Sequence, residues 1–233
     1  MKILQIGMGN VAGGLESFVM NYYRVLVHMD VQFDFVCMYD KIAYEDEIKK
    51  LGGKIYYIPN VKKNYQGYVK QLKRILRETK YDVVHVSMLS AANIVPLRIA
   101  GKMNIPKVIA HSHSSNSNFN KLTKTLHTIN KKRLNKLADV RLACSDAAGH
   151  FIFGNSNFEV IKNGIDTEKF SFNHAYRDEI RREFDIGDRF TLCHVGMFAP
   201  VKNHEFLIDI FASVVKKHQD SVLLLVGTGS EEE

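Results

Sequence analysis

Short apolar, β-branched runs alternate with longer amphipathic stretches from the first residue onward. The runs predict strands over 2–6, 32–38, 54–58, 83–86, 107–110, 140–143 and 159–161. The stretches between them predict helices over 15–28, 45–51, 65–79, 91–103, 121–136 and 146–153. Strands that alternate with helices are typical of βαβ units, so the pattern predicts an α/β, doubly wound domain with a parallel sheet.

A second α/β region follows residue 170. Its pattern predicts a helix over 175–184, a strand over 190–195, a helix over 203–217 and a strand over 222–226. So few elements cannot bury their apolar faces as an independent domain. We therefore expect a first domain over 1–170, a connecting segment over 171–188, and over 189–233 the beginning of a second domain, inside which the chain stops.

Composition and cysteine usage favour a reduced, folded protein. The chain has 233 residues, of which 45% are hydrophobic, enough for a packed core. Cys37, Cys144 and Cys193 lie far apart inside apolar runs without metal-ligand spacing. The N-terminus reads as a strand that runs into a turn, and no run approaches the roughly 18 apolar residues of a membrane-spanning helix. We expect a cytoplasmic protein.

The net charge of +7 is concentrated in one predicted helix. Residues 121–136 contain six Lys or Arg and no acid, and Leu122, Leu126 and Ile129 form a helical stripe. This pattern predicts a helix with one buried and one basic face. The basic face is either solvated or docks the protein peripherally on the anionic inner face of a membrane. Because no aromatic residues interleave with the charges, we expect no nucleic-acid partner.

A glycine-rich turn follows the first predicted strand. Residues 7–12 fit the Gly-x-Gly-x-x-Ala dinucleotide fingerprint, and Asp40 could bind a ribose, which would indicate an NAD(P)-binding oxidoreductase. However, the gap from Gly9 to Asp40 is long, and the helix is expected to start only after Gly13 and Gly14. These glycines either let the backbone approach an anion or only permit positive φ.

A polar run from His111 to Asn116 follows the predicted strand 107–110. Because residues i and i+2 of a strand share a face, His111 and His113 are both expected at the crevice beyond the strand's carboxyl end. A metal would need further His or Asp ligands at strand ends, and no such set is evident, so we expect no metal site. A packed structural histidine is the alternative for each.

The turn over 196–204 joins a predicted strand to a predicted helix and contains Lys202. Unpaired N–H groups, the helix dipole and the lysine charge together suit a diphosphate. An exposed lysine at the start of a helix is the alternative.

Three motifs together resemble the signature of glycosyltransferase family 4, which comprises nucleotide-sugar transferases of the two-Rossmann-domain (GT-B) architecture. The motifs are Gly13-Gly14-Leu15-Glu16, Val-Ile-Lys-Asn-Gly-Ile-Asp at 160–166 and Gly-Met-Phe-Ala-Pro-Val-Lys-Asn-His at 196–204. Two positions depart from the family: Lys162 stands where proline is usual, and Met197 stands where the arginine of a diphosphate clamp is usual.

The resemblance implies a GT-B fold with a complete N-terminal Rossmann-like domain and the start of a second one. It implies hexosyl transfer from a nucleoside diphosphate sugar to a polysaccharide or lipid-linked acceptor, as in capsule biosynthesis. The transfer would be retaining and metal-independent, without a cofactor. The residues implied for the donor's phosphates are Gly13, Gly14, Gly196 and Lys202. His113 would be catalytic, and Glu16 and His111 would contact the acceptor or support the site, with His111 packing against or supporting His113.

The family's acidic pair, two glutamates separated by seven residues, and its base pocket are expected beyond Glu233. The chain as given is therefore expected to bind acceptor or membrane but to have little or no transferase activity. A non-catalytic module that binds membranes or sugar phosphates is the alternative if these residues are the whole protein.

Overall fold

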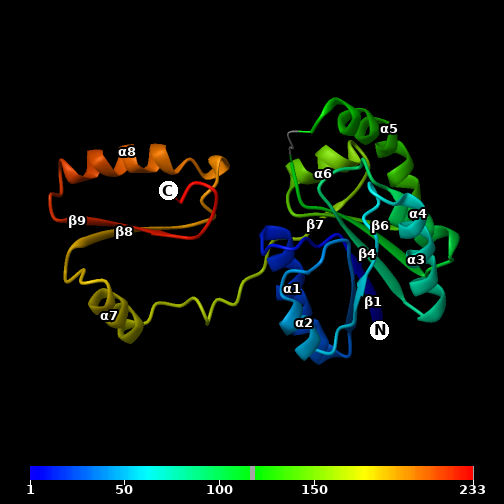
Figure 1. Cartoon of the computed structure of the whole chain (residues 1–233), viewed down its shortest axis with the longest axis horizontal. Coiled ribbons are helices and arrows are strands. Elements are labelled where there is room, and N and C mark those ends of the chain that lie inside the picture. The colour runs from blue at the N-terminus through cyan, green and yellow to red at the C-terminus, as the bar shows by residue number, and fades with distance from the viewer. Residues whose placement is uncertain (116–118, 233) are drawn as a thin grey trace. The chain divides into compact units, whose positions relative to one another are not determined.

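The computed structural model describes residues 1–115 and 119–232. The chain divides into two compact units, Met1–Asp166 and Thr167–Glu233 (Figure 1). Asn116, the end of the polar run that follows the fifth strand, lies outside the described residues. The boundaries expected at residues 170 and 188 stay predictions.

The first unit is built on a seven-stranded sheet in the order β3-β2-β1-β4-β5-β6-β7. The strands are β1 (Lys2–Ile6), β2 (Gln32–Cys37), β3 (Ile55–Tyr57), β4 (Val83–Met88), β5 (Lys107–Ser112), β6 (Val140–Ala143) and β7 (Glu159–Val160). All neighbouring pairs are parallel. The order runs outward from the β1–β4 pair in both directions, which is the switch point of a doubly wound sheet. The predicted α/β architecture is confirmed.

Helices cover both faces of this sheet. One face packs against α1 (Gly14–Leu26), η1 (Val27–Met29) and α2 (Glu45–Lys50). The other packs against α3 (Tyr65–Glu78), α4 (Val95–Lys102), α5 (Lys121–Leu137) and α6 (Asp146–Phe153) (Figure 1). Because strand side chains alternate between faces, Ile3 joins the first core and Leu4 the second.

Some element boundaries differ from those predicted. The helix expected from residue 91 begins at Val95, because Pro96 fixes the first turn and the Asn93 side chain accepts the Val95 N–H at 3.1 Å. Strand β5 continues past the predicted end at residue 110 to Ser112. His111 is consequently part of the sheet and not of the loop that follows it.

The second unit contains α7 (His174–Glu183), β8 (Phe190–Val195), η2 (Pro200–Lys202), α8 (His204–Val215) and β9 (Ser221–Val226). Strands β8 and β9 pair in parallel. Among the described residues of this unit only Ile186 and His204 are buried. Two strands and their helices therefore leave most of their apolar side chains accessible, as the element count predicts.

Candidate functional site

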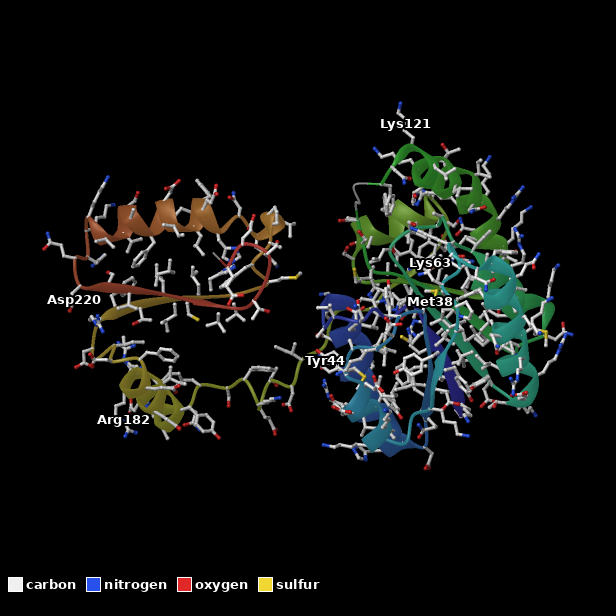
Figure 2. All side chains as sticks on the ribbon, viewed as in Figure 1. Met38, Tyr44, Lys63, Lys121, Arg182 and Asp220 are labelled. Atoms are coloured by element: carbon white, nitrogen blue, oxygen red, sulfur yellow. The ribbon has the colours of Figure 1, made fainter. Side chains whose placement is uncertain are left out.

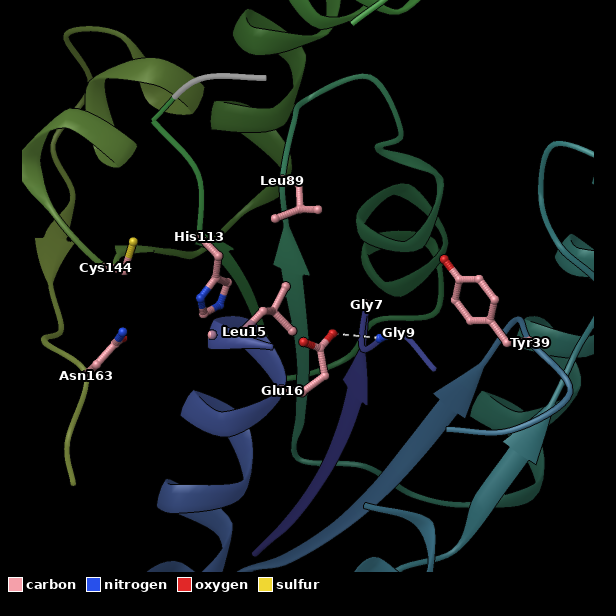
Figure 3. A pocket seen from close by; sticks show the side chains of 10 residues that line it. Gly7, Gly9, Leu15, Glu16, Tyr39, Leu89, His113, Cys144 and Asn163 are labelled. Atoms are coloured by element: carbon pink, nitrogen blue, oxygen red, sulfur yellow. Dashed lines mark hydrogen bonds between the residues drawn. The ribbon is translucent and has the colours of Figure 1, made fainter. Parts of the chain in front are cut away.

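A pocket of about 380 Å³ lies at the carboxyl edge of the first unit's sheet (Figure 3). Open α/β sheets bind ligands at this edge. The lining residues are Gly7, Gly9, Gly14, Leu15, Glu16, Tyr39, Leu89, His113, Cys144 and Asn163. Of the candidates from the sequence, the pocket brings together Gly14, Glu16 and His113.

Gly7 forms the floor of this pocket where β1 meets β4. Its φ is +112°, and a Cβ at this position would lie 2.1 Å from the Ser87 carbonyl oxygen. Only glycine fits such a contact with backbone. The chain can therefore turn off the sheet directly beside the end of β4.

Glu16 places a negative charge in the first turn of α1. Its Oε1 accepts the Gly9 N–H at 2.8 Å, and the residue is 9% exposed. A Cβ at Gly13 would lie 3.0 Å from Glu16 Oε2, whereas one at Gly14 would meet no atom within 4 Å. The carboxylate thus satisfies an N–H group and offsets the helix dipole. A dinucleotide fingerprint must lead directly into a helix. Because α1 begins only at Gly14, residues 7–12 do not meet this requirement.

Three histidines form a column that reaches the pocket. His85 Nε2 lies 3.2 Å from His111 Nδ1. The His111 and His113 rings are stacked with centroids 4.1 Å apart, and Phe18 makes a T-shaped contact with each of them. Among the described residues the Nε2 atoms of His111 and His113 have no hydrogen-bond partner. His113 lines the pocket, while His111 is fully buried beneath it.

Burial keeps this column neutral. Loss of solvation lowers the pKa of His113 to about 4. It lowers the pKa of His111 to about 2 and that of His85 to about 3, with neighbouring imidazoles adding to both shifts. All three are therefore uncharged near neutral pH. A neutral imidazole at the pocket can accept a proton or a hydrogen bond from a ligand hydroxyl.

Asn163 is a pocket residue that the sequence analysis did not identify. The Asn21 Nδ2 donates to the Gly164 carbonyl at 2.7 Å, and the Tyr22 hydroxyl donates to the Lys162 carbonyl at 3.2 Å. Helix α1 thus holds the backbone on both sides of Asn163, whose side chain lies beside His113 (Figure 3). The sequence feature that could have identified Asn163 is its position after a short strand, at the edge of the sheet where ligands bind.

The structure brings the two candidates of the second unit together. A Cβ at Gly196 would lie 3.1 Å from His194 Nε2 and 3.7 Å from Lys202 Cε. The Lys202 side chain therefore lies close to the bare backbone at the end of β8. Met197 is 53% exposed and offers no hydrogen-bond donor in place of the usual arginine.

The orientation of the basic helix α5 differs from the prediction. The stripe expected to be buried is accessible: Leu122 is 68%, Leu126 39% and Ile129 51% exposed. The buried side of the helix consists instead of His127, Asn130 and Leu134. The apolar stripe thus lies outward together with lysines such as Lys121, which points away from the unit (Figure 2).

Hydrogen bonds explain why polar side chains face inward on α5. His127 Nδ1 accepts the Ala91 N–H at 3.1 Å, and its Nε2 lies 3.2 Å from the Phe151 carbonyl. Asn130 Nδ2 donates to the Ala92 carbonyl at 3.1 Å. Buried polar groups that find partners cost little, so this face is stable without an apolar stripe.

Two features are absent from residues 1–115 and 119–232. No group of three or more His, Cys, Asp or Glu side chains is arranged to hold a metal ion in these ranges. No helix in them has the length and apolar character to span a membrane.

Sequence comparisons find a family profile over two of the three motif regions and a relative over nearly the whole chain. The profile of Glycosyltransferase Family 4 matches residues 12–169. EpsF of Bacillus subtilis (strain 168), a protein classed by inference as a glycosyltransferase, is 32% identical over 241 residues, covering 98% of this chain and 62% of EpsF. A GDP-mannose-dependent alpha-(1-6)-phosphatidylinositol monomannoside mannosyltransferase of Mycobacterium tuberculosis is 27% identical over 74 residues, covering 32% of this chain and 19% of that protein.

Solved structures with the same fold cover nearly the whole chain. HepE of Anabaena in complex with UDP matches with a TM-score of 0.78 at 18% identity, over 99% of this chain and 62% of HepE. A glycosyltransferase from Rickettsia africae matches with a TM-score of 0.75 at 18% identity, over 97% of this chain and 60% of that protein. These likenesses confirm the predicted GT-B type of α/β fold.

The neutral column predicts a loss of stability in acid. The unfolded state protonates His111 below about pH 6.5 but the native state does not, so the unfolding free energy falls as pH drops, by roughly 2 kcal/mol at pH 5 for this residue. In His111→Asn the loss between pH 7 and pH 5 is expected to be smaller by about that amount. Urea unfolding followed by circular dichroism measures it. The exposed His28 supplies the control His28→Asn; equal losses in wild type and His111→Asn would contradict the prediction.

Proposed function

The chain belongs to glycosyltransferase family 4, and from this premise we propose that the protein transfers a hexosyl residue from a nucleoside diphosphate sugar to a saccharide or lipid-linked acceptor. The observation that carries the proposal is the pocket in which the glycine turn, Glu16 and neutral His113 meet. The chain spans 62% of the length of EpsF, so the activity is proposed for the protein as a whole.

The donor's diphosphate is assigned to Gly196 and Lys202. HepE is described in complexes with UDP and with UDP-glucose, which supports a nucleotide-sugar donor. The leaving diphosphate gains negative charge in the transition state, and a cation held in place lowers that barrier. Because Lys202 supplies this charge, we propose that the transfer needs no metal or cofactor. We also propose that the transfer is retaining, as the resemblance to the family implies. We also propose that the backbone at Gly13 and Gly14 contacts the phosphates. These contacts add no net positive charge, and the Glu16 carboxylate lies beside Gly13.

The acceptor is assigned to the first unit. His113 is the proposed catalytic residue, because its neutral imidazole lines the pocket and can bind or share the proton of an acceptor hydroxyl. His111 stacks on His113 and sets the orientation of its ring. Glu16 holds the turn at Gly9 and leaves carboxylate oxygen available to the pocket.

Helix α5 is proposed to bind the cytoplasmic face of an anionic membrane. An exposed apolar stripe flanked by lysines fits a surface of lipid headgroups, since apolar side chains can insert while cations pair with phosphates. This position suits a protein of polysaccharide biosynthesis, including capsule formation, that works on a lipid-linked acceptor.

Lys202→Ala is expected to weaken binding of inorganic diphosphate at least about tenfold, because a hydrogen bond to a charged group contributes about 1.5–3 kcal/mol. Isothermal titration calorimetry with the 233-residue chain measures this. The matched control is Lys217→Ala, an exposed lysine of the same unit. Equal affinities of the wild type and Lys202→Ala would remove Lys202 from the donor site.

The reaction is tested with the full product of the reading frame that encodes this chain, using UDP-glucose and bacterial membranes. NMR of the product is expected to show the anomeric configuration of the donor retained, because the proposed mechanism is a retaining one. Addition of EDTA is expected to leave the rate unchanged, because Lys202 supplies the positive charge. An inverted product would refute retention, and loss of the rate with EDTA would refute metal independence.

Replacement of Leu122 and Ile129 together by serine is expected to weaken binding to anionic phosphatidylglycerol vesicles at least about tenfold, because two apolar side chains no longer insert. Vesicle sedimentation measures the bound fraction, which is also expected to fall with salt. Val25→Ser is the control, since Val25 is 62% exposed on α1. Equal binding to uncharged phosphatidylcholine vesicles would contradict the assignment.

A further inference from the structure

We propose that His194 and His204 donate hydrogen bonds to the donor's diphosphate and so take over the part of the arginine that Met197 replaces. The inference rests on the proposed function, which assigns this diphosphate to Gly196 and Lys202. It adds to that site two donors that neither the motif nor the lysine supplies.

Three imidazole nitrogens near the end of β8 are buried and have no hydrogen-bond partner among the described residues. They are Nε2 of His194 and both Nδ1 and Nε2 of His204. His204 is 7% exposed, so bulk solvent does not reach its ring. Because a buried polar group without a partner lowers stability, such groups in a folded protein indicate a partner that the chain itself does not provide.

The two histidine rings meet where β8 leads through η2 into α8 (Figure 1). Their centroids lie 5.1 Å apart at an interplanar angle of 81°, and Phe198 makes a T-shaped contact with His204 at 4.8 Å. These contacts hold the rings in place. A phosphate group presents several acceptor oxygens, so two rings this close can each donate to one of them.

The bare backbone of Gly196 gives an anion a way to these donors. A Cβ at Gly196 would lie 3.1 Å from His194 Nε2 and 3.7 Å from Lys202 Cε. A ligand oxygen near this point is therefore within hydrogen-bond distance of the imidazole and close to the lysine side chain. Because the lysine charge sits on a flexible stem, it can follow the phosphate while the packed rings stay fixed.

The first turn of α8 adds donors to the same site. Its N-cap residue Asn203 makes no side-chain capping hydrogen bond, and the first N–H groups of a helix have no partner inside the helix. The helix dipole is positive at this end. Glu205 is the acidic residue of this turn, and it is exposed. The site is consequently rich in donors, which suits a ligand whose oxygens only accept.

The histidines replace the arginine as donors and not as a second fixed charge. An arginine at position 197 would offer a bidentate fork of N–H groups, whereas Met197 offers none. An imidazole carries at least one N–H whether it is neutral or protonated. Two rings held by packing therefore restore two N–H contacts to the diphosphate.

The test measures binding of inorganic diphosphate to the 233-residue chain by isothermal titration calorimetry. His194→Met and His204→Met remove the N–H groups, and each is expected to weaken binding at least about tenfold. His194→Gln and His204→Gln keep an N–H on a side chain of similar length, so each is expected to stay within about threefold of the wild type. The matched control is His218→Met, an exposed histidine of the same unit, which is expected to bind like the wild type.

Restoring the arginine tests the exchange of roles. Met197→Arg is expected to tighten diphosphate binding at least about fivefold, because it adds a charged bidentate donor. In that background His194→Met is expected to cost less than about threefold, since the arginine then supplies the contact. An undiminished cost overturns the claim that the histidine does the arginine's part.

The proposal is overturned if the wild type does not bind diphosphate, or if either methionine variant folds and binds as tightly as the wild type. Should a methionine variant fail to fold, side-chain ¹H–¹⁵N NMR of the wild type decides. Added diphosphate is expected to shift the ring signals of His194 and His204 and to leave those of His218 in place. Unchanged signals of the first two rings overturn the proposal.

The proposed function fails separately. If Lys202→Ala weakens diphosphate binding and the methionine variants do not, the donor site remains and the histidines are not part of it. If the histidines prove necessary for diphosphate binding but the full reading-frame product transfers no sugar, the function is overturned and the anion site remains.

Discussion

The contact between Gly7 and the end of β4 is the constraint on which the site depends. A side chain at Gly7 would collide with the Ser87 carbonyl, and the φ of +112° already requires glycine. The chain therefore leaves the sheet at its switch point, where the following turn comes within hydrogen-bond distance of Glu16. His113 reaches the same edge from β5, so the pocket's chemistry follows from the path of the backbone.

Local patterns predict the first sheet and the edge that carries its pocket, since β-branched runs mark the strands and parallel sheets bind ligands at their carboxyl ends. They do not predict Asn163 as a pocket residue. Its placement depends on hydrogen bonds from Asn21 and Tyr22 to carbonyls 143 and 140 positions away in the chain. Contacts between residues so far apart in the chain produce no periodic pattern in the sequence. The apolar run also does not predict the end of β5, because the strand continues to Ser112 and includes His111 in the sheet.

Helix α5 shows where an amphipathic pattern misleads. Its apolar stripe predicts the buried face on the assumption that burial requires apolar side chains. The structure buries His127 and Asn130 instead, because backbone groups near residues 91, 92 and 151 hydrogen-bond with them. Polar residues with partners are as acceptable inside as apolar ones. The pattern identifies the helix correctly, but only the tertiary partners decide which face turns inward.

The distribution of charge follows from two incompatible demands on a protein proposed to work at an anionic surface. Lysines attract lipid headgroups through their charge, whereas an imidazole must be uncharged to accept a proton. The basic residues of α5 are outside the pocket, whose lining carries Glu16 and the neutral His113. Burial against His111 and Phe18 keeps His113 neutral. Because the imidazole of His113 is uncharged, it does not form an ion pair with the Glu16 carboxylate that lines the same pocket.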